Sequence, residues 1–265
     1  MQKSDTVFSS FALPAGEALA DTGITPAEQR VREDLAAAYR LCALNGWDDL
    51  IYTHLSARVP GPSHHFLVNP LGLAFDEITA SNLVKIDLDG RVIGNSSYRP
   101  NAAGFVIHGC IHAAREDAAC VMHLHTEAGM ALSALEDGLL PITQHAMRFV
   151  GRLGYHDYEG IALTIGERER LLTDLGSHAA LILRNHGTLT VGRSVGHAFV
   201  EMFYLEKAAR AQLLAQATGA PLRIPAPDIA ALTAHQWVTD LRGSGDREWP
   251  PLLRQLDRHG DGYKR

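Results

Sequence analysis

In the segment ALILRNHGTLTVG (residues 180–192), two apolar runs stand on either side of a short polar turn. This pattern predicts a strand, a tight turn and a second strand. Helical patterns precede and follow it, over residues 167–175 and 195–217. Since strands and helices mix along the chain without a strict βαβ alternation, we expect one layered α/β domain with a mixed or largely antiparallel sheet.

Cap residues and apolar periodicity set the limits of the other elements. Thr25, Pro26 and Glu28 form a capping box that opens a helix to about Leu44, and Ser194 caps the helix that follows it. Further patterns predict strands over residues 50–59, 65–70, 83–88 and 118–126, and helices over residues 102–114 and 127–135. We divide the chain into an irregular segment 1–24, a domain 25–220 and a C-terminal tail 221–265 packed on the domain.

Composition narrows the classes of partner. The 265 residues carry a net charge of −6, so no general positive field is present to hold a nucleic acid or an anionic membrane surface. No apolar stretch approaches the roughly 18 residues that span a bilayer, and no signal peptide is visible. The three cysteines show no CxxC pairing, and we expect them to be reduced in a cytoplasmic protein. A small-molecule ligand or a protein partner is expected.

Histidine is the unusual residue, with 14 copies. His123 and His125 stand two apart in a predicted strand, so both side chains leave the same face and can bind one ion. An isolated H-x-H is more often chance, but His186 adds a third imidazole, at a strand end before Gly187. Three ligands leave an open position, which is typical of a catalytic zinc site.

A second pair, His108 and His112, lies four residues apart on one face of a predicted helix. Gly109 replaces the glutamate of the H-E-x-x-H zinc motif, so we interpret both as buried, hydrogen-bonded helix residues. The chain has no GxGxxG, P-loop or GxSxG motif, which favours a metal lyase by elimination. An iron-dependent oxygenase is less favoured because no carboxylate partner for the histidines is evident.

The ordered segments YTHLSARV, NAAGFVIHGCIHAAR, VMHLHT, GYHDYEGIAL and LRNHGTLTVG resemble the class II aldolase/adducin family over about residues 28–215. The resemblance implies a three-layer α/β/α sandwich with a central, mostly antiparallel mixed sheet. It also implies a homotetramer with active sites at subunit interfaces. At the metal ligands the chain resembles the family's L-fuculose-phosphate aldolases, which implies that His123, His125 and His186 bind one divalent ion, zinc above all.

The sequence departs from the aldolase pattern where the base and the phosphate site would lie. Gly104 stands where the aldolases have their glutamate base, so the carboxylate is missing. Few hydroxyl donors remain in the segments that match the phosphate-binding ones, and we predict that the substrate is not a sugar phosphate. The residues expected to contact it are Asn69, Gly72 and Asn101.

Two residues are candidate proton donors. His145 falls near the position of the aldolases' interface tyrosine, and Tyr155 belongs to the polar segment GYHDYEG. Hydrogen bonding within the sheet or at an interface is an equally good interpretation of both.

Two functions therefore compete. The first is a divalent-metal-dependent lyase that acts on a small hydroxy- or keto-acid through a metal-stabilised enolate, by retro-aldol cleavage or by decarboxylation. Decarboxylation does not need the missing base. The second is a non-catalytic, adducin-like interaction domain that keeps a metal site.

Overall fold

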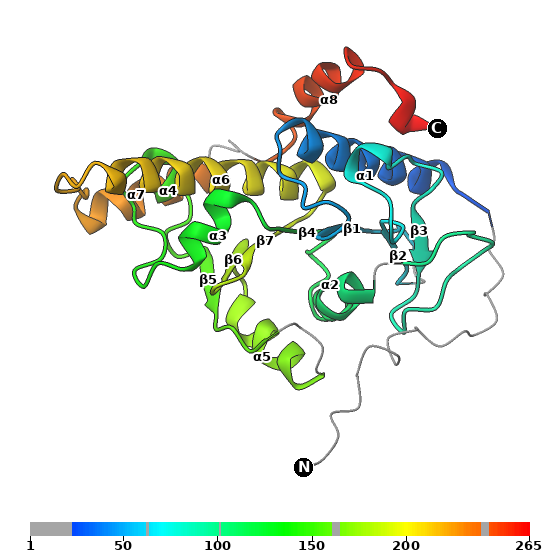
Figure 1. Ribbon diagram of the computed structural model, residues 1–265, viewed down its shortest axis with the longest axis horizontal. Helices are drawn as coiled ribbons and strands as arrows, with labels where there is room; N and C mark the ends of the chain where they lie inside the picture. The colour runs from blue at the N-terminus through cyan, green and yellow to red at the C-terminus, as the bar shows by residue number, and fades with distance from the viewer. Residues whose placement is uncertain (1–22, 62–63, 101, 161–164, 240–243) are drawn as a thin grey trace.

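A single sheet lies at the centre of the computed structural model, which describes residues 23–61, 64–100, 102–160, 165–239 and 244–265 (Figure 1). Within these residues the sheet has seven strands in the order β3-β2-β1-β4-β7-β6-β5. Neighbouring strands are antiparallel except for β5 and β6, which are parallel. The strands are β1 (His54–Arg58), β2 (Phe66–Val68), β3 (Val84–Ile86), β4 (Cys120–Leu124), β5 (Leu153–His156), β6 (Ala180–Leu183) and β7 (Gly187–Gly192).

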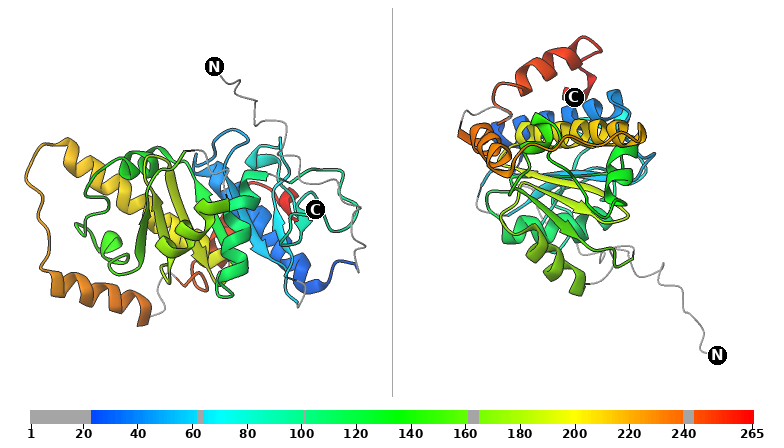
Figure 2. Two further views of the ribbon diagram at one scale, coloured as in Figure 1. Left: turned by 90° about the horizontal axis from the view of Figure 1, so that it is seen from below. Right: turned by 90° about the vertical axis from the view of Figure 1, so that its left-hand side faces the viewer.

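Helices cover both faces of this sheet, which confirms the expected three-layer architecture (Figure 2). Helices α1 (Pro26–Leu44) and α6 (Val195–Ala217) pack on one face, and α2 (Ala102–Ala114) and α5 (Ile165–Leu175) pack on the other. Strand β4 is buried on both sides: Met122 belongs to the core under α1 and α6, and Val121 to the core under α2 and α5. Side chains alternate along a strand, so His123 faces the α2 and α5 layer.

The cap residues begin the helices as predicted, with one difference. Oγ1 of Thr25 accepts a hydrogen bond from the Glu28 amide (3.1 Å), and Ser194 does the same for α6. The Glu28 carboxylate, however, is buried between Arg32 and Lys85, at 2.8 and 3.0 Å. The carboxylate neutralises two buried cations, and this stabilises the fold more than a hydrogen bond to the N-cap amide would. The glutamate half of the capping box is therefore not formed.

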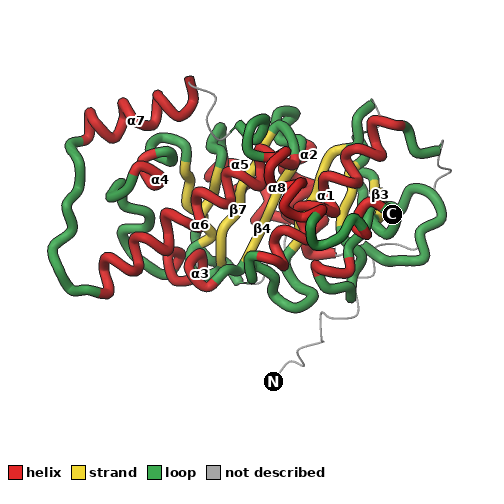
Figure 3. The backbone as a smooth tube through the Cα atoms, turned by 90° about the horizontal axis from the view of Figure 1, so that it is seen from above, coloured by secondary structure: helices red, strands yellow, loops and turns green. Residues whose placement is uncertain are grey.

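The C-terminal segment packs against the helical layer formed by α1 and α6 (Figure 3). Nε1 of Trp237 donates to the Gln144 carbonyl (3.0 Å), and Nε1 of Trp249 donates to Asp34 (2.8 Å). The remaining described elements are α3 (Glu127–Ser133), α4 (Gln144–Met147), α7 (Pro227–Thr239), α8 (Trp249–Asp257), and the 3-10 helices η2 (Phe75–Glu77) and η3 (Gly262–Lys264). Residues 1–22 of the expected irregular segment lie outside the described residues.

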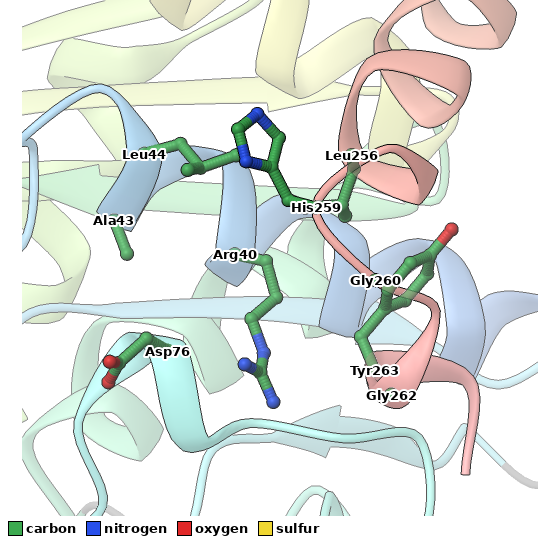
Figure 4. A pocket seen from close by; sticks show the side chains of 9 residues that line it. All are labelled: Arg40, Ala43, Leu44, Asp76, Leu256, His259, Gly260, Gly262 and Tyr263. Carbon is green, nitrogen blue, oxygen red and sulfur yellow. The ribbon is translucent and has the colours of Figure 1, made fainter.

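A pocket opens where the C-terminal segment meets α1 and η2 (Figure 4). Arg40, Asp76, His259 and Tyr263 are among the residues that line it, and none of the three candidate metal ligands is. In the part of the chain that the structure describes, no helix is both long enough and apolar enough to cross a membrane.

Candidate metal centre

Two neighbouring strands bring the three predicted ligands together. His123 lies in β4, His125 directly follows β4, and His186 ends the turn before β7. Strands β4 and β7 pair antiparallel with Leu124 opposite Thr188, so His125 lies beside this turn. A Cβ atom on Gly187 would lie 2.5 Å from the Leu124 carbonyl oxygen and 3.1 Å from the His125 ring. Only glycine permits so close an approach of the two backbones.

The three imidazoles form one compact cluster. Their ring centroids are 4.7 Å apart for His123–His125 and His123–His186, and 4.8 Å apart for His125–His186. One ring nitrogen from each lies within 4.8 Å of the other two. Nε2 of His123 and Nε2 of His125 are 3.0 Å apart.

The outer ring nitrogens of two of these residues are held in place. Nδ1 of His123 donates to the Thr188 carbonyl (3.1 Å), and Nδ1 of His125 donates to the Asp49 carboxylate (2.9 Å). Because a carbonyl and a carboxylate only accept, Nδ1 carries a proton in both rings, and in the neutral form of each ring the lone pair is on Nε2. This outer arrangement is typical of histidines that bind a metal.

The donor set fits a divalent ion. The two Nε2 atoms are 3.0 Å apart, so with both rings neutral their lone pairs repel unless a cation lies between them, and nitrogen ligands of a tetrahedral zinc are roughly 3.3 Å apart. Burial is the main cause that lowers the pKa of His123 well below its usual range, and burial with nearby imidazoles lowers the pKa of His186 to about 4. Both rings are therefore neutral at pH 7, which is the form that binds metals.

Polar side chains from the end of β5 border the cluster. The Tyr158 ring lies 6.3 Å from the His186 ring, and both line a small pocket with Arg184 and Glu159. The neighbouring His156 contacts Asp174, with Nδ1 2.7 Å from the carboxylate. Tyr158 is half exposed and lines this pocket.

A second group of histidines lies behind the cluster. His54, His108 and His112 are buried and hydrogen-bonded, which confirms the interpretation of the two helix histidines. Burial and the nearby imidazoles His125 and His186 lower the pKa of His54 to about 3. Burial and the Arg58 cation lower the pKa of His112 to about 3, and burial holds the pKa of His108 well below its usual range.

The two candidate proton donors lie in other contacts. The His145 ring packs against Tyr204 at 5.0 Å and Trp237 at 6.2 Å. The Tyr155 hydroxyl accepts a hydrogen bond from the Leu139 amide (3.0 Å). Neither ring is in contact with the three clustered histidines in the described structure, and the catalytic roles of both residues stay predictions.

The three expected substrate-binding residues differ in burial and in whether the structure describes them. Asn69 is fully buried, and among the described residues its side-chain oxygen and nitrogen have no hydrogen-bond partner. Gly72 is exposed in the loop after β2, with φ +92°. Asn101 lies outside the described residues. Gly104 lies in the first turn of α2, so this position supplies no carboxylate.

Sequence reasoning missed Asp49 and His54. Asp49 lies 76 residues before His125 in a loop, and nothing in the local sequence distinguishes it from the neighbouring Asp48. His54 could have been found from its predicted strand, but only the pairing of β1 with β4 places it opposite His123.

Comparison with known proteins identifies the family of this chain. Residues 33–213 match the family model described as class II aldolase and adducin N-terminal domain. A Caulobacter vibrioides protein named for aldolase class 2 is 52% identical over 91% of this chain and 94% of its own length. Rat alpha-adducin is 45% identical over 88% of this chain, which spans 34% of the adducin.

Two solved structures are similar over almost the whole chain. An aldolase II superfamily protein from Pseudomonas syringae has a TM-score of 0.88 and 51% identity, with 91% of this chain and 98% of that chain covered. An L-fuculose 1-phosphate aldolase from Glaciozyma antarctica has a TM-score of 0.80 and 31% identity, with 96% and 99% covered. The sequence matches, the shared fold and the family model agree: this chain belongs to the class II aldolase and adducin family.

Proposed function

We propose that this protein is a divalent-metal-dependent lyase that cleaves a carbon–carbon bond in a small, non-phosphorylated hydroxy- or keto-acid. The observation that carries the proposal is the convergence of His123, His125 and His186, with the Nε2 atoms of His123 and His125 3.0 Å apart. Three nitrogen donors and no protein carboxylate in the cluster favour zinc. A structural zinc has four protein ligands, so three leave room for a substrate.

The chain's own residues have distinct tasks in this proposal. His123, His125 and His186 hold the ion, which supplies a Lewis acid that polarises a substrate oxygen and stabilises developing negative charge. Asp49 and the Thr188 carbonyl orient two of the ligand rings. Tyr158 borders the cluster and is a candidate to donate a proton, in addition to the predicted donors His145 and Tyr155.

The missing base limits the reaction. Helix α2 presents Gly104 where the aldolases have a glutamate, so retro-aldol cleavage needs another proton acceptor. Decarboxylation releases carbon dioxide instead of a proton and does not need this group. Both reactions develop the same negative charge beside the ion, and the proposal includes both.

A substrate screen tests the reaction. The zinc-loaded protein is incubated with a panel of small hydroxy- and keto-acids, and pyruvate and carbon dioxide are measured. We expect turnover of at least one acid, abolished in a His125→Ala variant. Because the similar Glaciozyma antarctica structure is named an L-fuculose 1-phosphate aldolase, this sugar phosphate belongs in the same panel. Turnover of the sugar phosphate alone would contradict the non-phosphorylated substrate.

The second candidate is a non-catalytic interaction domain. The 45% identity with alpha-adducin and the absence of a carboxylate at Gly104 both favour it. The two candidates differ in one outcome, since an interaction domain binds the ion and turns over no acid of the panel.

The proposal includes a homotetramer with active sites at subunit interfaces. Light scattering after gel filtration tests it, with an expected mass of four chains of 28.8 kDa. A monomer at micromolar concentration would contradict the homotetramer but would not test the metal site.

The three cysteines are free thiols, which fits the reducing cytoplasmic compartment that we propose.

A further inference from the structure

A buried chain of hydrogen bonds leads from α2 to the metal centre. Nδ1 of His112 lies 3.0 Å from the Ala118 carbonyl oxygen, and Nε2 of His112 lies 2.7 Å from Oγ of Ser56. The same Oγ lies 2.7 Å from Nδ1 of His108, and Nε2 of His108 lies 2.9 Å from Nδ1 of His54. All four residues of this hydrogen-bonded series have buried side chains.

The carbonyl at one end fixes the direction of every hydrogen bond. A carbonyl only accepts, so His112 carries its proton on Nδ1, and its neutral ring accepts from Ser56 at Nε2. The Ser56 oxygen must then accept from Nδ1 of His108, which leaves Nε2 of His108 as an acceptor for Nδ1–H of His54. The last ring in the chain therefore has its proton on Nδ1 and a lone pair on Nε2.

This lone pair belongs to a residue beside the three clustered ligands. His54 in β1 pairs with His123 in β4, and their ring centroids are 5.3 Å apart. His54 is not a member of the cluster whose nitrogens all lie within 4.8 Å. In the described part of the chain, no other residue makes a hydrogen bond to Nε2 of His54. Thr53 holds the preceding backbone at φ +60°, which is strained for a β-branched residue.

We propose that Nε2 of His54 accepts a hydrogen bond from a hydroxyl group of the small acid bound at the metal centre. The inference rests on the proposed function and narrows its substrate to acids that carry a hydroxyl beside the carboxylate. The fixed direction of the chain gives the specificity: a locked lone pair binds a hydroxyl donor and repels an anionic oxygen of a phosphate. His54 is thus a specificity-determining residue.

The proton positions can be measured without any activity. Long-range ¹H–¹⁵N NMR spectra separate the two imidazole tautomers, and we expect His54, His108 and His112 to carry the proton on Nδ1. Ser56→Ala interrupts the series of hydrogen bonds, so His108 and His54 should then populate both tautomers. Ser56→Thr keeps the hydroxyl and should restore the single Nδ1–H tautomer. A proton on Nε2 of His54 in the wild type, or no response to Ser56→Ala, would overturn the inference.

Ligand binding tests the specificity. Glycolate and acetate share a carboxylate and differ by one hydroxyl, and calorimetry on the zinc-loaded protein compares their dissociation constants. We expect His54→Leu to reduce the preference for glycolate over acetate roughly five-fold, which is the value of one hydrogen bond. Ser56→Ala should reduce it in the same direction with His54 intact, so the test does not depend on one variant folding.

Zinc content, measured on the same samples, distinguishes a failure of the proposed function from a failure of the inference about His54. A wild type that holds no zinc would contradict the proposed function. Zinc lost in His54→Leu and kept in the wild type would make His54 a ligand and overturn the inference. Zinc kept in both, with an unchanged preference for glycolate, would overturn the inference alone.

Discussion

The His125 ring depends on two other residues that stand far apart in the sequence. Asp49 accepts its Nδ1–H at 2.9 Å, and Gly187 leaves the space in which the ring lies. Neither residue contacts the other ring nitrogen, so both position the ring of a residue that we propose as a metal ligand.

Replacement of Asp49 should weaken metal binding without unfolding the protein. Asp49→Asn removes the charge that holds the His125 proton on Nδ1, and loss of such a partner typically costs about 10–100-fold in metal affinity. Competition with a chelator of known zinc affinity measures the change. Asp48→Asn is the matched control, because Asp48 is the exposed carboxylate next to it. Equal affinities for the two variants would contradict the orienting role.

Replacement of Gly187 should disturb both stability and the centre. In Gly187→Ala the new Cβ would meet the Leu124 carbonyl at 2.5 Å, so β7 and β4 must separate. Overpacking of this kind costs about 1–3 kcal/mol of unfolding free energy. Urea unfolding measures it, with Gly262→Ala as control because nothing lies within 4 Å of that Cβ. If the two variants were equally stable, the close approach would not limit residue 187.

At the scale of elements, α2 and β1 are joined by polar side chains within an otherwise apolar layer. His108 and His112 lie one turn apart on α2, and both contact Ser56 on β1. Helical periodicity predicts that the two histidines share a face, but it cannot say which strand the face meets. That information is in the sheet order, which places β1 next to β4.

This layer should make stability depend on pH. The pKa of His112 is about 3 in the folded protein, against the ordinary 6.5, so the unfolded chain binds a proton that the folded one does not. The stability is complete above pH 6.5 and falls as the pH is lowered from there toward 3, by about 1.4 kcal/mol per pH unit well below 6.5 for each such group. Urea unfolding between pH 7 and 5 measures this slope.

A variant isolates the contribution of this histidine. His112→Asn should be less stable at pH 7 by about 1–3 kcal/mol, because the buried Ser56 hydroxyl loses Nε2 of His112 as its acceptor. Between pH 6 and 5 the slope of its stability against pH should be smaller than the wild-type slope, by the amount that corresponds to the uptake of one proton on unfolding. His235→Asn removes an exposed histidine and should leave the slope unchanged. A wild-type slope in His112→Asn would show that another group binds the proton.

At the scale of the whole molecule, an ion pair joins α4 to α6. The Arg148 guanidinium contacts the Glu201 carboxylate at 2.8 and 2.7 Å, and Arg152 adds a third contact at 2.7 Å. Burial alone would raise the pKa of Glu201, but hydrogen bonds from His197 and Arg148 lower it to about 2. The Arg148 cation also lies 5.1 Å from the Trp237 ring, so the pair supports α7 as well.

Neutralising Glu201 should destabilise the protein strongly. Glu201→Gln removes the carboxylate charge that Glu201 supplies to the buried Arg148, and breaking a buried ion pair typically costs about 3–5 kcal/mol. Thermal and urea unfolding measure the loss, and Asp246→Asn, at an exposed ion pair with Arg193, should change stability by less than about 1 kcal/mol. Equal effects of the two substitutions would contradict the structural role of the buried pair.

Features of this molecule that depend on neighbouring residues could be predicted from the sequence, and features that depend on distant contacts could not. Caps such as Thr25 and Ser194 act within one helical turn, so the sequence alone located these helices. His123 and His125 share a strand face by period two, and His186 precedes a glycine turn, so the convergence of these three histidines could also be predicted. Asp49 and the direction of the His54 chain depend on contacts between residues more than 50 positions apart, which no local pattern records.

The central claim is that His123, His125 and His186 bind one divalent ion between them. Zinc per chain, measured by elemental mass spectrometry after loading and dialysis, tests it most directly in the wild type, His123→Ala and His235→Ala. We expect one zinc ion per chain in the wild type and in His235→Ala, and none in His123→Ala. A wild type that takes up no zinc, or a His123→Ala variant that keeps it, would show that the three histidines do not bind an ion together.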